Sequence, residues 1–269
     1  MFVRLATAAV VVGLAAALTL RAFWDPTPTF EPAADEGATL VEASDLQAFS
    51  ERRIFFGHMS VGKNILSGLR EVGAEHGVAP AAEVEVEVGA TSVPDLPDGG
   101  LLVHALIGEN RHPVGKLENF EALVRGGLGD QVDMAALKFC YVDVSWYTDV
   151  EDLFGTYRET MDRLEADFPD VRFVHMTVPL TTGPHGIKDR LKVVLGRDDN
   201  AARERYNDLM RAAYGPDQLF DIAAIEAQGP DGTTGEHALF GGYSSDGAHL
   251  NAAGASLVAA ELVNFVTRS

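Results

Sequence analysis

The chain has 269 residues, 46% of them hydrophobic, and glycine and proline are spread along its whole length. This composition predicts one packed domain with a sizeable core and excludes a fibrous or disordered chain. The formal net charge of -19, with no basic stripe in the sequence, argues against nucleic acid as a partner, because phosphate binding needs clustered lysine and arginine.

The first two dozen residues differ in kind from the rest. Residues 1–4 form a short basic stretch, and residues 5–20 form an apolar run that is free of charge. This pattern predicts either a signal peptide or an N-terminal membrane anchor within residues 1–24. Both interpretations place the protein outside the cytoplasm, as a secreted, periplasmic or membrane-anchored chain. We expect the acidic, proline-rich residues 25–37 to be a linker and residues 38–269 to form the folded domain.

Strands and helices are expected to alternate along the folded domain. Valines alternate with glutamates over residues 83–88, which predicts a strand with one wet face near a sheet edge. Residues 90–115 hold proline, glycine and polar residues around a brief apolar interruption at 101–107, so we expect a long functional loop there. The other predicted strands are 53–56, 134–144, 171–178 and 219–222, and the predicted helices are 61–76, 119–124, 150–168, 199–214 and 252–267. This alternation predicts an α/β fold with a parallel sheet covered on both faces.

A serine stands just after the first predicted strand, in the segment Phe56-Gly57-His58-Met59-Ser60-Val61-Gly62. Ligands of open α/β sheets bind beyond the carboxyl ends of the strands. The N-terminus of the following helix offers free N–H groups that would stabilise an oxyanion. Ser60 is therefore a candidate nucleophile, and the alternative is that it only caps the helix.

A carboxylate and an imidazole stand close together in the segment Asp246-Gly247-Ala248-His249. The glycine between them allows the carboxylate to turn back toward the imidazole. A serine nucleophile needs such a base, and an acidic group that holds the base in the right tautomer. The alternative is a plain loop before a helix capped by Asn251.

Together these residues resemble the SGNH/GDSL hydrolase superfamily, whose nucleophile follows the first strand and whose last block is D-x-x-H. The closest resemblance is to a variant branch with G-H-x-S in place of G-D-S. The likeness runs from about residue 50 to residue 268 and includes Asp221-Ile222-Ala223. It implies a flavodoxin-like, three-layer α/β/α sandwich with a central parallel sheet. It also implies that Ser60 is the nucleophile, His249 the base and Asp246 the carboxylate that orients His249.

The oxyanion donor departs from the superfamily pattern. The block that normally reads G-x-N-D is Cys140-Tyr141-Val142-Asp143 here, without the asparagine donor. We expect the Asn110 side chain, the Gly108 backbone and the Ser60 N–H to replace that asparagine. Asn64, one helical turn after Ser60, is a weaker candidate. A simple turn is the alternative role for Asn110.

The sequence therefore predicts an exported serine esterase that forms an acyl-serine intermediate and needs no cofactor. A small-molecule or glycan ester is the expected substrate. An acyl transferase shares the same intermediate and stays open. The altered oxyanion block motivates a second hypothesis, a non-catalytic glycan-binding or scaffold protein of the same fold.

A nucleotide-binding protein is the third hypothesis. Residues 57–63 fit G-x-x-x-x-G-K after a strand. Asn64 stands where a magnesium-binding Ser or Thr belongs, and this hypothesis leaves Asp246 and His249 without a role.

The remaining reactive, charged and aromatic side chains are less informative about function. The other histidines form no i, i+4 pair and have no cysteine partner, so we predict no metal site. Cys140, the one cysteine, is expected to be buried. Lys138 either has a buried partner or lies at an edge with its ammonium in solvent. Trp146 and Tyr147 either stack on a sugar ring or belong to the core.

Overall fold

A six-stranded parallel sheet forms the centre of the molecule, in the order β2-β3-β1-β4-β5-β6. The computed structural model describes residues 23–26, 28–89, 93–230, 232, 235 and 237–268. The strands are β1 (Arg53–His58), β2 (Ala82–Glu85), β3 (Leu101–Leu106), β4 (Met134–Leu137), β5 (Arg172–Met176) and β6 (Leu219–Phe220).

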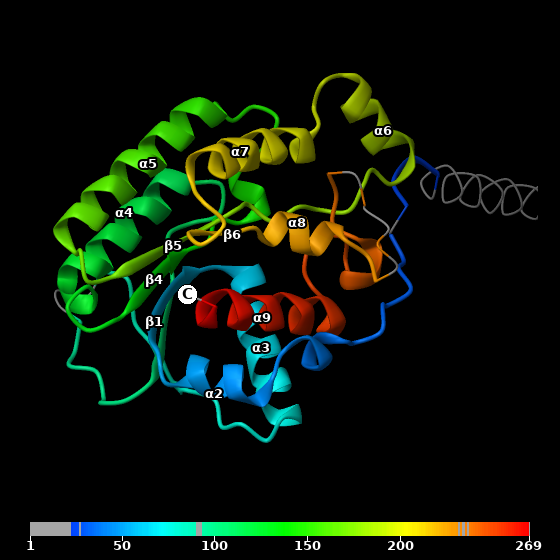
Figure 1. The fold of residues 1–269 in the computed structure, drawn as a ribbon. Helices are drawn as coiled ribbons and strands as arrows, with labels where there is room; N and C mark the ends of the chain where they lie inside the picture. The colour runs from blue at the N-terminus through cyan, green and yellow to red at the C-terminus, as the bar shows by residue number, and fades with distance from the viewer. Residues whose placement is uncertain are drawn as a thin grey trace, which may run out of the picture.

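Helices cover both faces of this sheet (Figure 1). The α-helices are α2 (Ala43–Ser50), α3 (Ser60–Glu75), α4 (Pro113–Leu123), α5 (Val150–Asp167), α6 (Gly186–Val194), α7 (Asp199–Ala213), α8 (Ile222–Ala227) and α9 (Ala252–Thr267). Three short 3-10 helices, η1 (Gly37–Leu40), η3 (Tyr141–Asp143) and η4 (Gly241–Tyr243), and a π-helical turn, η2 (Val124–Leu128), complete the described elements. The three-layer α/β/α architecture predicted from the sequence is confirmed.

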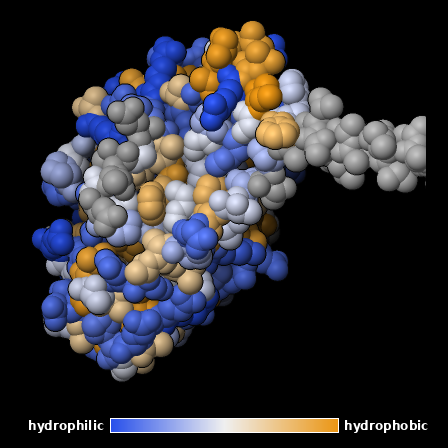
Figure 2. All heavy atoms as spheres, turned by 90° about the vertical axis from the view of Figure 1, so that its right-hand side faces the viewer, coloured by the Kyte–Doolittle hydropathy of each residue, from blue (hydrophilic) through white to orange (hydrophobic). Residues whose placement is uncertain are grey.

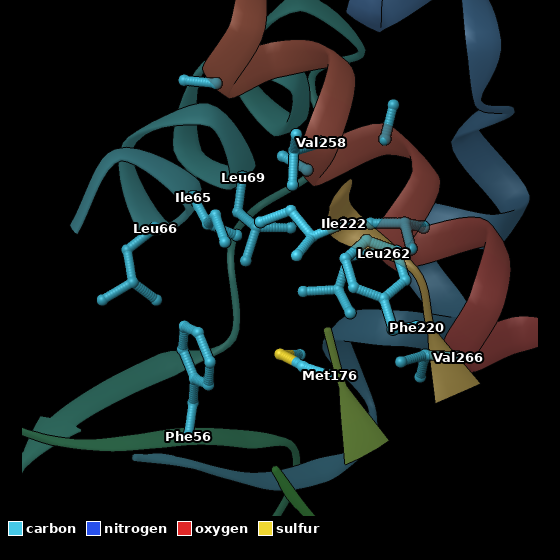
Figure 3. Close-up of a cluster of buried hydrophobic side chains, with 14 of the residues drawn as sticks. Phe56, Ile65, Leu66, Leu69, Met176, Phe220, Ile222, Val258, Leu262 and Val266 are labelled. Atoms are coloured by element: carbon cyan, nitrogen blue, oxygen red, sulfur yellow. The ribbon is translucent and has the colours of Figure 1, made fainter. Parts of the chain in front are cut away.

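The two faces of the sheet bury two separate cores. Phe56 points toward α3, α8 and α9, where it packs among Ile65, Leu66, Met176 and Leu262 (Figure 3). The neighbouring Phe55 points to the opposite face and stacks on Phe120 of α4. Because successive side chains of a strand alternate between faces, a strand buried on both faces needs apolar residues pointing both ways.

This requirement explains the main error of the sequence prediction. Leu101–Leu106 is not an interruption in a long loop but β3, paired with β2 and β1 inside the sheet. A short apolar run without alternation cannot be assigned from periodicity alone. The predicted edge strand is confirmed in β2, and α5 and α9 closely match their predicted bounds. Helices α2, α6 and α8 were not predicted.

The segment expected to be a linker makes specific contacts with the domain. The Ala33 N–H donates to the Gly242 carbonyl at 2.8 Å, and the Ser256 hydroxyl donates to the Asp35 carboxylate at 3.1 Å. Gly37 is buried against Ser256 at the start of η1. Residues 33–37 therefore pack on the domain instead of leading freely into it.

None of the helices within the described ranges is long and apolar enough to cross a membrane. The apolar run at residues 5–20, predicted to be a signal or an anchor, lies outside those ranges.

Candidate active site

Asp246 and His249 form a close pair in the loop before α9. His249 Nδ1 lies 2.7 Å from Asp246 Oδ2. The other oxygen, Oδ1, accepts hydrogen bonds from the N–H groups of Ala248 and His249 at 2.9 and 2.8 Å. The carboxylate thus turns back onto its own loop.

This loop is fixed by three residues around it. Gly247 has φ +89°, a left-handed conformation that glycine adopts without strain, and its carbonyl accepts from the Thr182 N–H at 2.9 Å. The Ser244 hydroxyl donates to the His249 carbonyl at 2.7 Å and accepts from the Gly247 N–H at 2.9 Å. Asn251 caps α9 by accepting from the Gly254 N–H. The Asn251 cap and the Asp246–His249 pair therefore occur together and are not alternatives.

The Asp246 carboxylate sets the tautomer of His249. Burial raises the pKa of Asp246, but hydrogen bonds from the His249 N–H, the His249 imidazole and the Ala248 N–H outweigh it and leave that pKa below its usual range. An ionised carboxylate only accepts hydrogen bonds, so the proton of a neutral His249 stays on Nδ1. The Nε2 atom is then free to take a proton.

Tyr141 is the neighbour of His249 Nε2. Its hydroxyl is 3.5 Å from His249 Nε2, and the two rings meet edge to face. The buried Arg203 holds the Tyr141 backbone in place through a hydrogen bond to its carbonyl at 2.7 Å. Nothing in the sequence pattern indicated Tyr141 or Arg203, because both act through contacts between distant segments.

Ser60 is the first residue of α3, two residues after the last residue of β1. The residue at the N-cap is Met59, and no side chain caps this helix. The helix-capping alternative for Ser60 is therefore wrong. Met59 alone separates strand from helix, with Gly57 inside β1 and Gly62 inside α3. This turn is too short for the glycine-rich loop that cradles phosphates, and the nucleotide-binding hypothesis fails.

The parallel sheet brings Ser60 and the Asp246–His249 pair to the same edge. Strands β1 and β4 are neighbours, with Gly57 in register with Leu137. Ser60 follows β1, and Tyr141 follows β4, so the tyrosine that contacts His249 stands at the same strand ends as Ser60. No hydrogen bond joins Ser60 to His249 among the described residues.

The predicted oxyanion residues differ in their freedom to donate. The Gly108 N–H is engaged by the Asn119 side-chain oxygen at 3.1 Å. The Asn110 Oδ1 atom accepts from Lys116 Nζ at 3.2 Å, which leaves the amide N–H₂ of Asn110 as its donor end. The Asn64 Oδ1 atom is buried and has no hydrogen-bond partner within the described structure.

A buried ion pair ties the loop of Asn110 to the turn after β4. Lys116 Nζ lies 2.6 Å from Asp143 Oδ2, and both side chains are fully buried. The same carboxylate accepts from the N–H groups of Arg111 at 2.8 Å and Cys140 at 2.6 Å. Asp143 therefore holds two loops at the carboxyl ends of β3 and β4 in a fixed relation.

A pocket opens beside the Asp246 loop. Its wall includes Tyr141, Arg203, Asp246 and Gly247, and Ser60 and His249 are not part of it. Trp146 and Tyr147 also line this pocket, and they are 46% and 64% exposed. They are therefore not core residues. The Arg197 guanidinium lies 5.0 Å from the centre of the Trp146 ring, and the Tyr147 ring is the more exposed of the two.

The other singled-out residues are structural. Lys138 is fully buried, so the edge alternative is wrong; its ammonium donates to the Phe139 carbonyl at 3.1 Å, and burial lowers its pKa. Cys140 is buried, as predicted. The buried His58 contacts the Met59 carbonyl and His104. No cluster of three or more potential metal ligands occurs in the part of the chain that the structure describes.

Comparison with known proteins gives matches among solved structures. No family model and no curated protein matches the chain. A protein from Streptococcus pneumonia, provisionally titled a platelet activating factor, matches with a TM-score of 0.48 and 15% identity over 96% of this chain and 99% of its own. An acetyl xylan esterase, AlAXEase, has a TM-score of 0.44 and 17% identity over 79% and 98%. A Desulfitobacterium hafniense DCB-2 protein, provisionally titled a lipolytic protein of the G-D-S-L family, has values of 0.40 and 9% over 79% and 97%.

The chain's own topology agrees with the resemblance to the SGNH superfamily. The serine follows the first strand of a parallel sheet, and the D-x-x-H motif directly precedes the last helix.

Proposed function

We propose that the protein is an extracytoplasmic serine esterase of the SGNH type. The observation that carries this proposal is the 2.7 Å contact between His249 Nδ1 and Asp246 Oδ2, which leaves Nε2 as a base at the sheet edge where Ser60 begins α3. The apolar residues 5–20 support the location outside the cytoplasm.

The reaction proceeds in two steps. The Ser60 hydroxyl oxygen attacks the ester carbonyl, and its proton moves to His249 Nε2. The resulting oxyanion receives hydrogen bonds from the Ser60 N–H and the Asn110 amide. The intermediate collapses, the alcohol leaves with the proton from His249, and an acyl-serine remains. In the second step, a water molecule gives a proton to His249 and its oxygen attacks the acyl carbonyl. The carboxylic acid leaves, and His249 returns the proton to the Ser60 oxygen. If an acceptor alcohol reaches the acyl-serine instead of water, the same site is an acyl transferase.

An acyl group on a glycan is the substrate class that the pocket suits best. Tyr147 exposes a flat ring in the pocket that Asp246 also lines, and Trp146 lies beside it with the Arg197 guanidinium over its ring. Aromatic rings of this kind bind the apolar faces of sugars while their polar groups stay wet.

The test is labelling of the full chain with a fluorophosphonate, which reacts only with an activated serine. We expect mass spectrometry to find the label on Ser60, and we expect both Ser60→Ala and His249→Ala to abolish it. The matched control is Ser67→Ala, which removes another hydroxyl from the same helix and is expected to label normally. A folded wild-type protein that takes no label would favour the non-catalytic glycan-binding alternative.

A further inference from the structure

Helix α6 differs from the other long helices because it has no buried residue. Instead it and the residue after it present apolar side chains to solvent. Val194 is 81% exposed, and Leu195 is 61% exposed. Ile187 and Leu191 add to the same surface, which Figure 2 shows as hydrophobic colour gathered at the top of this face of the molecule. An apolar helix surface of this kind marks an interaction site.

Basic side chains are concentrated on α6 and just after it. Residues 186–197 contain four basic side chains and one acidic side chain, and Asp198 and Asp199 follow directly, whereas the chain carries a net charge of -19. The basic residues are Lys188, Arg190, Lys192 and Arg197. An amphipathic helix that combines exposed aliphatic residues with lysine and arginine suits the boundary of an anionic lipid bilayer.

The beginning of α6 packs against the end of the N-terminal segment. A side chain placed at Gly186 would lie 2.2 Å from the Pro26 ring and 3.1 Å from the Trp24 carbonyl, so the two backbones are in close contact. Lys188 Nζ lies 2.6 Å from Asp25 Oδ2. Phe23 and Trp24, which are 73% and 47% exposed, follow the apolar residues 5–20 almost directly in sequence. The exposed surface of α6 is therefore continuous with the place where the apolar N-terminal segment joins the domain.

We propose that α6, together with Phe23 and Trp24, lies on the surface of an anionic lipid bilayer. Aromatic residues at such a junction prefer the bilayer interface. Lys188 pairs with Asp25 and Lys192 with Asp189, so the exposed Arg190 is the basic side chain of α6 that meets anionic headgroups. This contact holds the domain at a second point beyond the N-terminal segment, and so fixes its orientation.

The orientation has a consequence for the pocket. Asp189, Lys192 and Val193 of α6 form part of the wall of the pocket that reaches Asp246. With α6 on the bilayer, this pocket opens next to the lipid headgroups. Substrate would then be collected at the membrane surface.

The test uses the full chain in liposomes that contain anionic phosphatidylglycerol. A nitroxide is attached to Val194→Cys on α6. The control nitroxide is attached to Asp170→Cys, which precedes the amino end of β5, whereas the chain leads to α6 from the carboxyl end of that strand. The native Cys140 is fully buried and does not compete for the label. Collision rates with oxygen and with a water-soluble nickel chelate report the depth of each label.

We expect the nitroxide at residue 194 to be shielded from nickel and accessible to oxygen, while the nitroxide at residue 170 stays accessible to nickel. Arg190→Glu and phosphatidylcholine liposomes should each weaken the shielding. Equal nickel access at both positions would overturn the proposal, whatever the outcome of fluorophosphonate labelling. Dipolar broadening of the residue 194 signal, which rises with protein concentration, would instead assign this surface to a second copy and would also overturn it.

Discussion

The orientation of the His249 imidazole depends on its contact with Asp246, three residues earlier in the sequence. Asp246 reaches His249 across one left-handed glycine, and Ser244 and Thr182 fix the loop from either side. The tautomer of His249 therefore depends on the charge of Asp246 more than on the shape of its side chain.

Asp246→Asn tests this dependence. The amide has nearly the same shape, but it can donate a hydrogen bond to Nδ1 and so place the proton on Nε2. We expect kcat for p-nitrophenyl acetate to fall by about 10³- to 10⁴-fold. The circular dichroism spectrum should not change, because the side chain is half exposed. Asp170→Asn is the matched surface control, and equal activity of the two variants would contradict this role of Asp246.

At the scale of secondary-structure elements, close packing of helices and a buried ion pair position the loops of the site. Helix α3, which begins with Ser60, packs against α9, which follows His249, and Gly68 allows their close approach. The pair of Lys116 and Asp143 joins the loops after β3 and β4.

Gly68→Ala tests the contact between α3 and α9. The added Cβ would lie 2.2 Å from the Ala255 carbonyl oxygen, so one helix must move. We expect the free energy of unfolding to fall by about 1–3 kcal/mol, as in other overpacked cores. Gly155→Ala in α5 is the matched control, because its Cβ would enter open space. That variant should gain about 0.5–1 kcal/mol. Urea denaturation measures both, and equal effects would contradict the close contact.

Lys116→Met tests the buried ion pair. The change leaves the Asp143 carboxylate buried without its cation, so we expect a loss of about 3–5 kcal/mol in the free energy of unfolding. Arg125→Met removes a partly exposed cation that pairs with Glu121 and Asp167, and it should cost less than about 1 kcal/mol. The same urea titrations compare the two variants. Similar losses of unfolding free energy in the two variants would mean that the buried Lys116–Asp143 pair stabilises the fold no more than the partly exposed pairs of Arg125.

At the scale of the whole molecule, buried histidines make the folded state sensitive to acid. Burial lowers the pKa of His175 to about 3 and, as the largest cause, that of His58 to about 4. In the unfolded chain both take up a proton near pH 6.5. The unfolded state therefore binds more protons below that pH, and stability is lost as the pH falls from about 6.5 toward 4.

His175→Gln isolates one of these contributions. We expect the wild-type protein to lose up to about 1.4 kcal/mol more than the variant per pH unit of acidification in this range. Burial raises the pKa of Glu226 to about 8, which gives the opposite slope, but the difference between the two proteins removes it. Urea midpoints at several pH values between 4 and 7 provide the measurement. Parallel curves for the two proteins would show that His175 is not protonated on unfolding.

The sequence by itself determined the features that depend on local chemistry. The α/β class, helices α5 and α9 and the edge strand β2 follow from periodicity within one element. The fold of the Asp246–His249 turn also follows from its sequence, because the contact spans three residues and needs only a glycine between them.

Only the tertiary structure decided the features that depend on distant contacts. Strand β3 is apolar apart from His104 because both of its faces are buried, and its own sequence does not show that burial. Tyr141 contacts His249 across 108 positions of sequence, and Ala33 donates a hydrogen bond to Gly242. Both contacts arise from the order of the strands in the sheet and from the helices that pack on it. Such contacts carry no periodic signal in either partner, because each is made by a single side chain or a single backbone group.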